Sequence, residues 1–285
     1  MPIALLPDRA LVTVTGEDAT DLLQGVLTCN VASLDEAEAR LGALLTPQGK
    51  ILFDFLISRI EGGFRLDCAA DQAPGLARRL ALYRLRAKVD IAADPTVAVA
   101  AAWGGAMPAA EVARAADARS PDLGARLYAG EGAFSADASP EDYHAHRIAL
   151  AVPEGGRDFA YGDAFPHEAL MDQLGGVDFR KGCYVGQEVV SRMQHRGTAR
   201  TRILAAHYPE GEAASPGSEV TAGGKVLGTT GSAAGAIGLA TIRLDRLGDA
   251  LSGGETLRAG GRAVALERPA YARFAMPEAA GAPAA

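Results

Sequence analysis

After Gly197 the sequence becomes a series of short apolar runs separated by glycine turns, and this pattern constrains the fold more than any other feature. The runs cover residues 202–208, 219–221, 225–230, 236–244, 255–258 and 262–266. Many short strands with glycine at the reversals are typical of a sheet that closes into a small barrel. The sequence therefore predicts a β-barrel domain over 201–275, preceded by a domain over 1–200 and followed by a disordered tail over 276–285.

The first 200 residues mix strand and helix patterns, which predicts an α+β fold class. The predicted strands cover residues 10–14, 41–45, 51–57, 64–68 and 97–103, and the predicted helices cover 19–27, 74–88, 111–116, 140–151 and 187–197. A hairpin turn is expected at 46–50, because Pro47 and Gly49 stand where the chain must reverse.

Asp54 lies inside the otherwise apolar strand 51–57. An unpaired carboxylate in a strand core is costly, so we expect Asp54 to face a cleft or to have a partner. The plainer alternative is an exposed position at a sheet edge.

The predicted helix 74–88 has one strongly basic side. Its cations occur with no acid between them: Arg78, Arg79, Arg84, Arg86 and Lys88. Such a run is usually a solvated face, and the alternative is contact with an anion.

Composition excludes several functional classes. The net charge of −7 argues against a DNA-binding or anionic-membrane protein, although RNA remains a weaker alternative. The three cysteines form no CxxC pair, so no zinc site or disulfide framework is indicated, and we expect no bound metal. The N-terminus lacks the pattern of a signal peptide, and no apolar run reaches the ~18 residues of a membrane span. We therefore expect a cytoplasmic protein.

The segment 180–197 concentrates reactive and charged side chains. Gly182 and Gly186 predict a tight loop around Cys183, followed by a helix from Gln187. Between residues 178 and 202 six lysines or arginines stand against two acids. Cations and a helix start favour a thiolate, which makes Cys183 a candidate nucleophile or ligand; a buried structural cysteine is the alternative.

Residues 181–188, KGCYVGQE, resemble the K-G-C-Y-x-G-Q-E signature of the YgfZ-type folate-binding proteins. These are relatives of the glycine-cleavage T-protein, an aminomethyltransferase, and they assist the assembly or repair of iron-sulfur clusters. A match of seven specified residues arises by chance on the order of once in a billion positions at average amino-acid usage.

The resemblance implies a T-protein-like folate-binding domain with an inserted α+β subdomain, followed by the C-terminal barrel. It implies tetrahydrofolate or a derivative as cofactor, iron-sulfur client or assembly proteins as partners, and a link to tRNA modification in a bacterial cell. The residues that it assigns to the reactive loop are Cys183, Lys181, Gln187 and Glu188, and those that it assigns to folate are Asp54, Tyr184, Gly186, Arg192 and Arg126.

Other segments resemble the T-protein family less specifically. Residues 14–31 resemble its opening, with Asn30 where the family often has Asp. Residues 117–126 resemble a D-x-R…G-x-R pattern, which implies a strand at 126–129 beside the folate pocket. In the aminomethyltransferases the strand after the hairpin typically carries two consecutive acids, whereas this chain has Phe53 and Asp54. The resemblance thus favours a folate pocket near Asp54 more than it favours the transferase reaction.

Three functions follow from these patterns. The first is a folate-dependent accessory factor for iron-sulfur proteins, mainly of the [4Fe-4S] type, that acts through Cys183. The second is a tetrahydrofolate-dependent aminomethyl or methyl transferase with Asp54 as the acid-base group. The third is a thiol hydrolase in which His195 or His167 activates Cys183.

Overall fold

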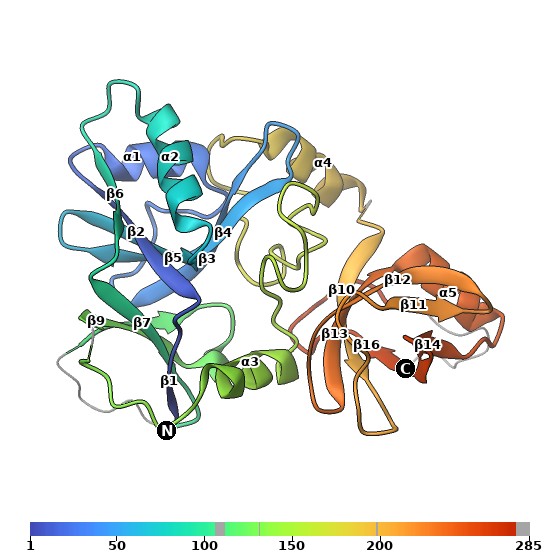
Figure 1. Cartoon of the computed structure of the whole chain (residues 1–285). Helices are drawn as coiled ribbons and strands as arrows, with labels where there is room; N and C mark the ends of the chain where they lie inside the picture. The colour runs from blue at the N-terminus through green and yellow to red at the C-terminus, as the bar shows by residue number, and fades with distance from the viewer. Residues whose placement is uncertain (106–111, 131, 198, 278–285) are drawn as a thin grey trace. The chain divides into compact units, whose positions relative to one another are not determined.

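A computed structural model describes residues 1–105, 112–130, 132–197 and 199–277. The described chain divides into two compact units, drawn in Figure 1. The first unit consists of Met1–Tyr143 and Leu174–Ser191, and the second of His144–Gln173 and the chain from Arg192 onward. Most of the predicted tail, from residue 278, lies outside the described residues.

The first unit is built on a mixed sheet that has nine strands in the described part of the chain, in the order β1-β7-β9-β8-β3-β4-β5-β2-β6. The strands are β1 (Ile3–Leu5), β2 (Arg9–Thr15), β3 (Glu38–Leu45), β4 (Ile51–Ile60), β5 (Gly63–Ala69), β6 (Asp90–Asp94), β7 (Val97–Ala102), β8 (Ala113–Asp117) and β9 (Ala125–Gly130). Within this described sheet the neighbouring strands pair antiparallel, except for the short parallel pairing between β3 and β8.

The β3–β4 hairpin forms where the sequence predicts it. Within its turn the Thr46 N–H donates to the Lys50 carbonyl at 2.8 Å, and the Gly49 N–H donates to the Thr46 carbonyl at 2.9 Å. Gly49 has a φ of 82°, in the left-handed region that glycine adopts without a steric penalty.

Two helices, α1 (Ala19–Val26) and α2 (Ala73–Arg84), cover one face of this sheet (Figure 1). Leu23 of α1 and Leu76 and Leu80 of α2 are fully buried in a core with Phe55 and Leu66 from the strands. Burial of each such side chain contributes about 1.5–3 kcal/mol, so this core fixes which face of β4 and β5 points inward.

Two predicted helices differ from the structure. Helix α2 ends at Arg84 rather than at 88, because Leu85 takes a φ of 45° and breaks the helical path. A helix over 111–116 is wrong: β8 occupies Ala113–Asp117 and pairs with β9, so sheet pairing overrides the weak helix propensity of an alanine-rich segment. Residue 111 lies outside the described residues.

The second unit contains the predicted barrel sheet. Its strands are β10 (Thr201–His207), β11 (Glu219–Ala222), β12 (Lys225–Ala234), β13 (Ile237–Arg243), β14 (Leu257–Ala259), β15 (Arg262–Ala263) and β16 (Ala265–Glu267). Helix α5 (Leu244–Ser252), which the sequence analysis did not predict, packs Leu247 against the core of these strands. Helices and sheets together make the chain α+β, as predicted.

Helices α3 (Pro140–Ala149) and α4 (Gln187–Arg196) each begin in the first unit and end in the second. Residues 150–186 between them contain neither helix nor strand. Within the described ranges the structure has no helix that is both long and apolar enough to span a bilayer.

Candidate functional site

The segment 181–188, here called the signature loop, is fixed at its base by Asp178. One carboxylate oxygen of Asp178 accepts the backbone N–H groups of Arg180 and Lys181 at 2.7 and 3.1 Å, and the other accepts Asn30 Nδ2 at 3.0 Å. Burial by itself raises the pKa of Asp178, but these hydrogen bonds outweigh it and hold the pKa below its usual value. Asn30 therefore serves as a donor, whereas an Asp at this position would bring two carboxylates together.

Lys181 anchors the loop to the connection that follows α1. Its buried Nζ donates to the carbonyl oxygens of Leu27 at 2.6 Å and Cys29 at 2.8 Å, and it lies 5.2 Å from the centre of the Tyr184 ring. Burial lowers the pKa of Lys181 to about 8, while the electrostatic interactions of Lys181 with Cys29 and Asp178 act in the opposite direction. The Lys181 ammonium thus binds backbone oxygens in the interior.

Tyr184 is 7% exposed, and its hydroxyl has no hydrogen-bond partner among the described residues. Burial raises the pKa of this phenol, and the charge of Asp178 raises it further. A buried donor without a partner costs free energy, and a bound ligand or an ordered water would satisfy it. This observation fits the prediction that Tyr184 helps to hold a cofactor.

Gly186 locks the loop onto the β3–β4 turn. Gly186 has a φ of 79°, and a Cβ at this position would lie 2.5 Å from the Thr46 carbonyl oxygen. A Cβ on Gly49 would lie 3.1 Å from the Val189 Cβ and 3.3 Å from the Gly186 carbonyl oxygen. Two glycines therefore allow two backbones to touch, which explains why both sequence motifs contain one.

Cys183 is the one exposed thiol of the three cysteines. Cys29 and Cys68 are fully buried, and burial raises the pKa of their thiols to about 11 and about 12. Only Cys183 can therefore meet a partner without unfolding of the surrounding structure.

Three more predicted residues lie on α4. Gln187 is its first residue, and its N–H donates to the Tyr184 carbonyl at 3.3 Å; Glu188 and Arg192 are exposed. A turn of three residues separates Cys183 from the helix start. Glu188 and Arg192 are four residues apart, which places them on the same side of the helix.

Arg126 belongs to a second group of residues, buried in the first unit and 2% exposed. Its Nη2 donates to the Tyr143 hydroxyl at 2.7 Å, and its Nε lies 3.7 Å from Asp67 and 3.9 Å from Asp117. Arg119 binds Asp117 through two hydrogen bonds of 2.9 and 2.7 Å. Burial raises the pKa of Asp117, but the two guanidinium groups outweigh it and keep the pKa low.

Asp67 on β5 belongs to the same buried group as Arg126 and contacts two more of its residues. Arg9 Nε donates to Asp67 Oδ1 at 2.7 Å, and the Tyr128 hydroxyl lies 3.5 Å from Asp67 Oδ2. The Arg65 guanidinium lies 3.8 Å from the centre of the Tyr128 ring. Because β9 and β5 are not neighbours in the sheet order, the sheet must curve to bring Arg126 and Tyr128 toward Asp67.

This buried group contains four arginines, at positions 9, 65, 119 and 126, together with the carboxylates of Asp67 and Asp117. Nε and Nη1 of Arg126 form no hydrogen bond within the described chain. A carboxylate-bearing ligand would supply an acceptor for these two N–H groups.

Asp54 is partly buried on β4, opposite Ala43 on β3. Strand alternation and register place it on the same sheet face as Leu56 and Asp67, away from the core under α1 and α2. Because β4 lies between β3 and β5, the alternative of a position at the sheet edge is wrong. In the described residues no hydrogen bond or ion pair joins Arg126 to the signature loop, so the predicted residues form two groups.

Sequence reasoning missed Asp67 and Arg9. Asp67 lies within β5, GFRLDCA, where it interrupts an apolar run as Asp54 does in β4. The same argument about a carboxylate in a strand would therefore have found it. Arg9 gave no such signal, because a lone arginine at a strand start is normally a surface residue.

The two histidines considered as bases for Cys183 differ in burial. His167 belongs to the second unit, where its Nε2 lies 3.0 Å from Gln194 Oε1 and burial lowers its pKa. His195 is exposed near the end of α4. Both histidines belong to the second unit and Cys183 belongs to the first, so the hydrolase alternative stays a prediction.

Comparison with known proteins gives relatives over most of the chain. The family described as "CAF17, C-terminal beta-barrel domain" matches residues 200–274. The human protein "Iron-sulfur cluster assembly factor IBA57, mitochondrial" is 32% identical over 281 residues, which cover 85% of this chain and 77% of that protein. The Neurospora crassa protein "Iron-sulfur cluster assembly factor IBA57 homolog, mitochondrial" is 35% identical over 227 residues, which cover 70% of this chain. The match covers 52% of the Neurospora crassa protein, about half of its length.

A solved structure, the glycine cleavage system aminomethyltransferase T from Bartonella henselae, has the same fold. It superposes with a TM-score of 0.75 at 14% identity, over 97% of this chain and 87% of that one. The chain thus has an aminomethyltransferase-like fold with a C-terminal β-barrel, as predicted.

The expected cytoplasmic location is wrong. The human, mouse and Neurospora crassa relatives are all named as mitochondrial proteins, and they come from eukaryotes rather than from bacteria. The absence of a recognisable signal peptide did not distinguish between these compartments.

Proposed function

Because the chain belongs to the family of iron-sulfur cluster assembly factors named IBA57, we propose that it is a folate-dependent accessory factor for the assembly or repair of iron-sulfur proteins, mainly of the [4Fe-4S] type. The observation that carries the proposal is the exposed Cys183 thiol, held on a loop whose base is fixed by Asp178 and Lys181. Its partners are iron-sulfur client or assembly proteins.

A single thiolate limits what the protein can do with a cluster. Clusters normally need about four protein ligands, and Cys29 and Cys68 are buried. Cys183 can therefore contribute one ligand, or attack one site, on a cluster that a partner protein holds. We expect the purified protein to lose any cluster during desalting; retention of a full cluster would contradict this.

Tetrahydrofolate fits the unsatisfied groups of the first unit. The N–H groups of Arg126 that form no hydrogen bond in the described chain suit a folate carboxylate, and the Tyr184 hydroxyl, which has no partner there, offers a polar contact. Asp54 and Gly186, which also belong to the first unit, complete the residues proposed to hold it there. Bound tetrahydrofolate would supply a reduced pterin that carries one-carbon units. The narrower resemblance to YgfZ-type proteins and the link to tRNA modification belong to the same proposal.

The test is complementation of cells that lack this protein. Activities of several [4Fe-4S] enzymes are measured with wild type, Cys183→Ala and Cys68→Ala, and the levels of all proteins are checked by immunoblot. We expect wild type and Cys68→Ala to restore activity and Cys183→Ala to fail. Enzyme activities that do not depend on the protein would refute the assembly role.

Folate binding is tested on the purified protein. We expect tetrahydrofolate to raise the melting temperature of wild type, and Arg126→Leu to abolish that shift. Arg258→Leu, an exposed arginine in the barrel unit, is the matched control and keeps the shift. An equal shift in the Arg126 variant would place the cofactor elsewhere.

The transferase alternative has one favourable observation, the partly buried Asp54 on the sheet face that also carries Asp67. Incubation with tetrahydrofolate and a methylamine-bearing donor tests it. Formation of methylene-tetrahydrofolate that Asp54→Asn abolishes would establish the transferase in place of the accessory role.

A further inference from the structure

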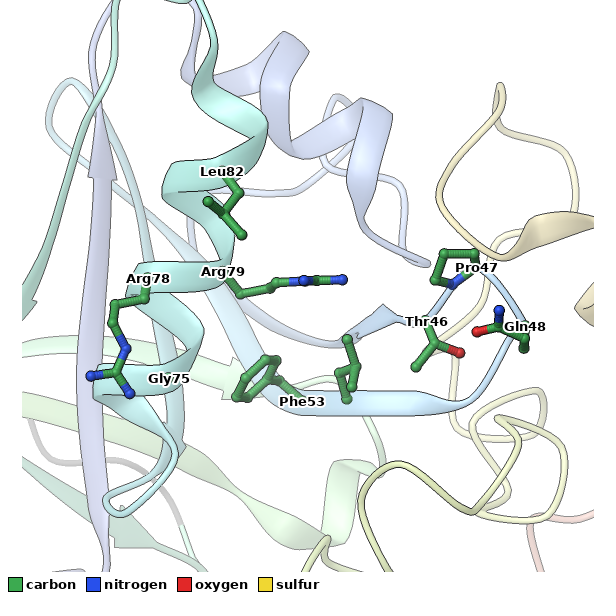
Figure 2. A pocket seen from close by; sticks show the side chains of 9 residues that line it. Thr46, Pro47, Gln48, Phe53, Gly75, Arg78, Arg79 and Leu82 are labelled. Atoms are coloured by element: carbon green, nitrogen blue, oxygen red, sulfur yellow. The ribbon is translucent and has the colours of Figure 1, made fainter.

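A groove of about 630 Å³ lies in the first unit between α2 and the β3–β4 turn. Figure 2 shows α2 as one wall, with Leu82 and Arg79, and the turn at Thr46, Pro47 and Gln48 as the other. Phe53 of β4 lies between them in Figure 2, and Leu52 of β4 also lines the groove. None of the functions proposed above uses this groove.

The α2 wall is strongly basic. In the described structure Arg78, Arg84 and Arg86 contact no carboxylate, and no acid occurs from residue 73 to residue 88. Arg79 extends from α2 over the groove (Figure 2), and its buried Nε has no hydrogen-bond partner in the described chain. Only Lys88 is neutralised, by Glu17 at 2.8 Å. In a chain of net charge −7, this helix is therefore an uncompensated positive patch.

Large apolar side chains are also exposed on α2 and directly after it. Leu82, which lines the groove, is 67% exposed, and Leu85, which follows the last residue of α2 and is not part of the groove lining, is 89% exposed. These are the highest values among the large apolar residues that the structure describes. Leu85 also has a φ of 45°, a conformation that a leucine adopts only at a cost in free energy. Exposed leucines beside unpaired arginines are the composition of a surface that a partner covers.

We infer that this groove docks an acidic segment of a partner protein that inserts at least one large apolar side chain. The carboxylates of the segment pair with Arg78 and Arg79, and its apolar side chain lies on Phe53 against Leu82. The inference rests on the proposed function for the identity of the partner, an iron-sulfur client or assembly protein. Gly49, in the same turn as the groove wall, packs on Gly186 and Val189, so docking occurs beside the signature loop.

A protein segment fits the groove better than a membrane or RNA. The apolar side of α2, with Leu76 and Leu80, faces the core, so only Leu82 and Leu85 are exposed enough to contact a bilayer. A helix that binds a membrane surface needs a full apolar face. The groove lining includes one aromatic ring, Phe53, where single-stranded RNA binding uses several rings for stacking.

The test uses a phage library of random twelve-residue peptides, panned on the full-length wild-type protein. We expect the enriched peptides to carry a net negative charge and at least one large apolar residue. Synthetic copies should bind at least ten-fold more weakly to Arg78→Glu/Arg79→Glu and to Leu82→Ser/Leu85→Ser. The matched control is Arg246→Glu/Arg258→Glu, two exposed barrel arginines that contact no carboxylate in the described structure; it should bind as wild type does.

Enriched peptides without acidic bias, or peptides that bind the groove variants as tightly as wild type, would overturn the inference. Two further assays test the other ligands: sedimentation with phosphatidylserine vesicles and the mobility shift of a single-stranded RNA. The inference would also be overturned if the wild-type protein selects no acidic peptide but binds the vesicles or the RNA, and if Arg78→Glu/Arg79→Glu abolishes that binding. Cys183→Ala should keep peptide binding. The two proposals can therefore be refuted independently. Peptide binding tests the groove, and the activity of [4Fe-4S] enzymes in complemented cells tests the Cys183 thiol.

Discussion

Gly186 and Gly182 occupy the same loop but have different space around them. A Cβ on Gly186 would meet the Thr46 carbonyl at 2.5 Å, whereas a Cβ on Gly182 would meet nothing within 4 Å. We expect Gly186→Ala to lower the free energy of unfolding by about 2–5 kcal/mol, because strain from a positive φ adds to the clash. Gly182→Ala should change it by less than about 1 kcal/mol.

Urea denaturation followed by the fluorescence of Trp103 checks this expectation. Trp103 is the only tryptophan of the chain and lies in the first unit, so its signal reports that unit. Equal denaturation midpoints for the two variants would show that the loop does not rest on the hairpin turn.

Lys181 should make stability depend on pH in the alkaline range. Its pKa of about 8 in the folded state lies below the ordinary value of 10.5, so the unfolded chain holds this proton more tightly. The cost of the buried charge is therefore fully present below pH 8 and is lost between pH 8 and 10.5. We expect the stability of wild type relative to Lys181→Met to rise across this interval.

The measurement is a series of urea denaturations of both proteins from pH 7 to 10, together with an NMR titration of the lysine side chains. Because the variant shares every other titrating group, the difference between the two curves isolates Lys181. A difference that does not change with pH, with Lys181 titrating above pH 10, would contradict the prediction.

At the scale of elements, one hydroxyl joins the α1–β3 connection to the segment 174–191. Thr28 Oγ1 donates to the Gly176 carbonyl at 2.6 Å and accepts the Ala43 N–H at 2.9 Å, both in buried surroundings. Thr28→Val keeps the shape and leaves two buried polar groups without a partner, so we expect a loss of about 2–4 kcal/mol.

Thr13→Val on β2 is the matched control. The Thr13 hydroxyl reaches the Ala92 carbonyl at 3.3 Å in an exposed setting, and valine suits a strand, so this change should stay within about 0.5 kcal/mol. Trp103 fluorescence in urea compares the two variants. Similar losses of stability in both variants would show that the buried Thr28 hydroxyl contributes no more to the free energy of unfolding than the exposed Thr13 hydroxyl.

At the scale of the whole molecule, each unit has its own core and its own buried charges. In the second unit Asp158 accepts Arg147 Nη1 at 2.9 Å, the Glu154 N–H at 2.9 Å and the Ser232 N–H at 2.7 Å. These contacts tie the segment 144–173 to β12 of the barrel. Asp158→Asn should therefore cost about 1–3 kcal/mol in this unit, because it removes the nearer of the two carboxylates beside the buried Arg147 and leaves Glu154, 3.4 Å from Arg147 Nε.

Hydrogen exchange measured by mass spectrometry separates the two units. We expect Asp158→Asn to accelerate exchange mainly in residues 144–173 and 192–277, and Thr28→Val mainly in residues 1–143 and 174–191. Equal acceleration across both units in either variant would mean that the chain unfolds as one cooperative body.

The sequence by itself determined the features that depend on local pattern. The β3–β4 hairpin, α1, α4, the strands of the barrel and the α+β class follow from periodicity and from glycine and proline at the reversals, because those effects act over a few residues. The signature residues were also visible, because they are contiguous.

Only the tertiary structure decided which of these residues meet. Lys181 binds carbonyls more than 150 residues earlier in the chain, and Arg126 meets Asp67 because the sheet curves between β5 and β9. A helix was predicted over residues 111–116, but residues 113–117 form strand β8 because they pair with β9. Long-range pairing and burial set these outcomes, and neither leaves a periodic trace in the sequence, so spacing along the chain could not reveal them.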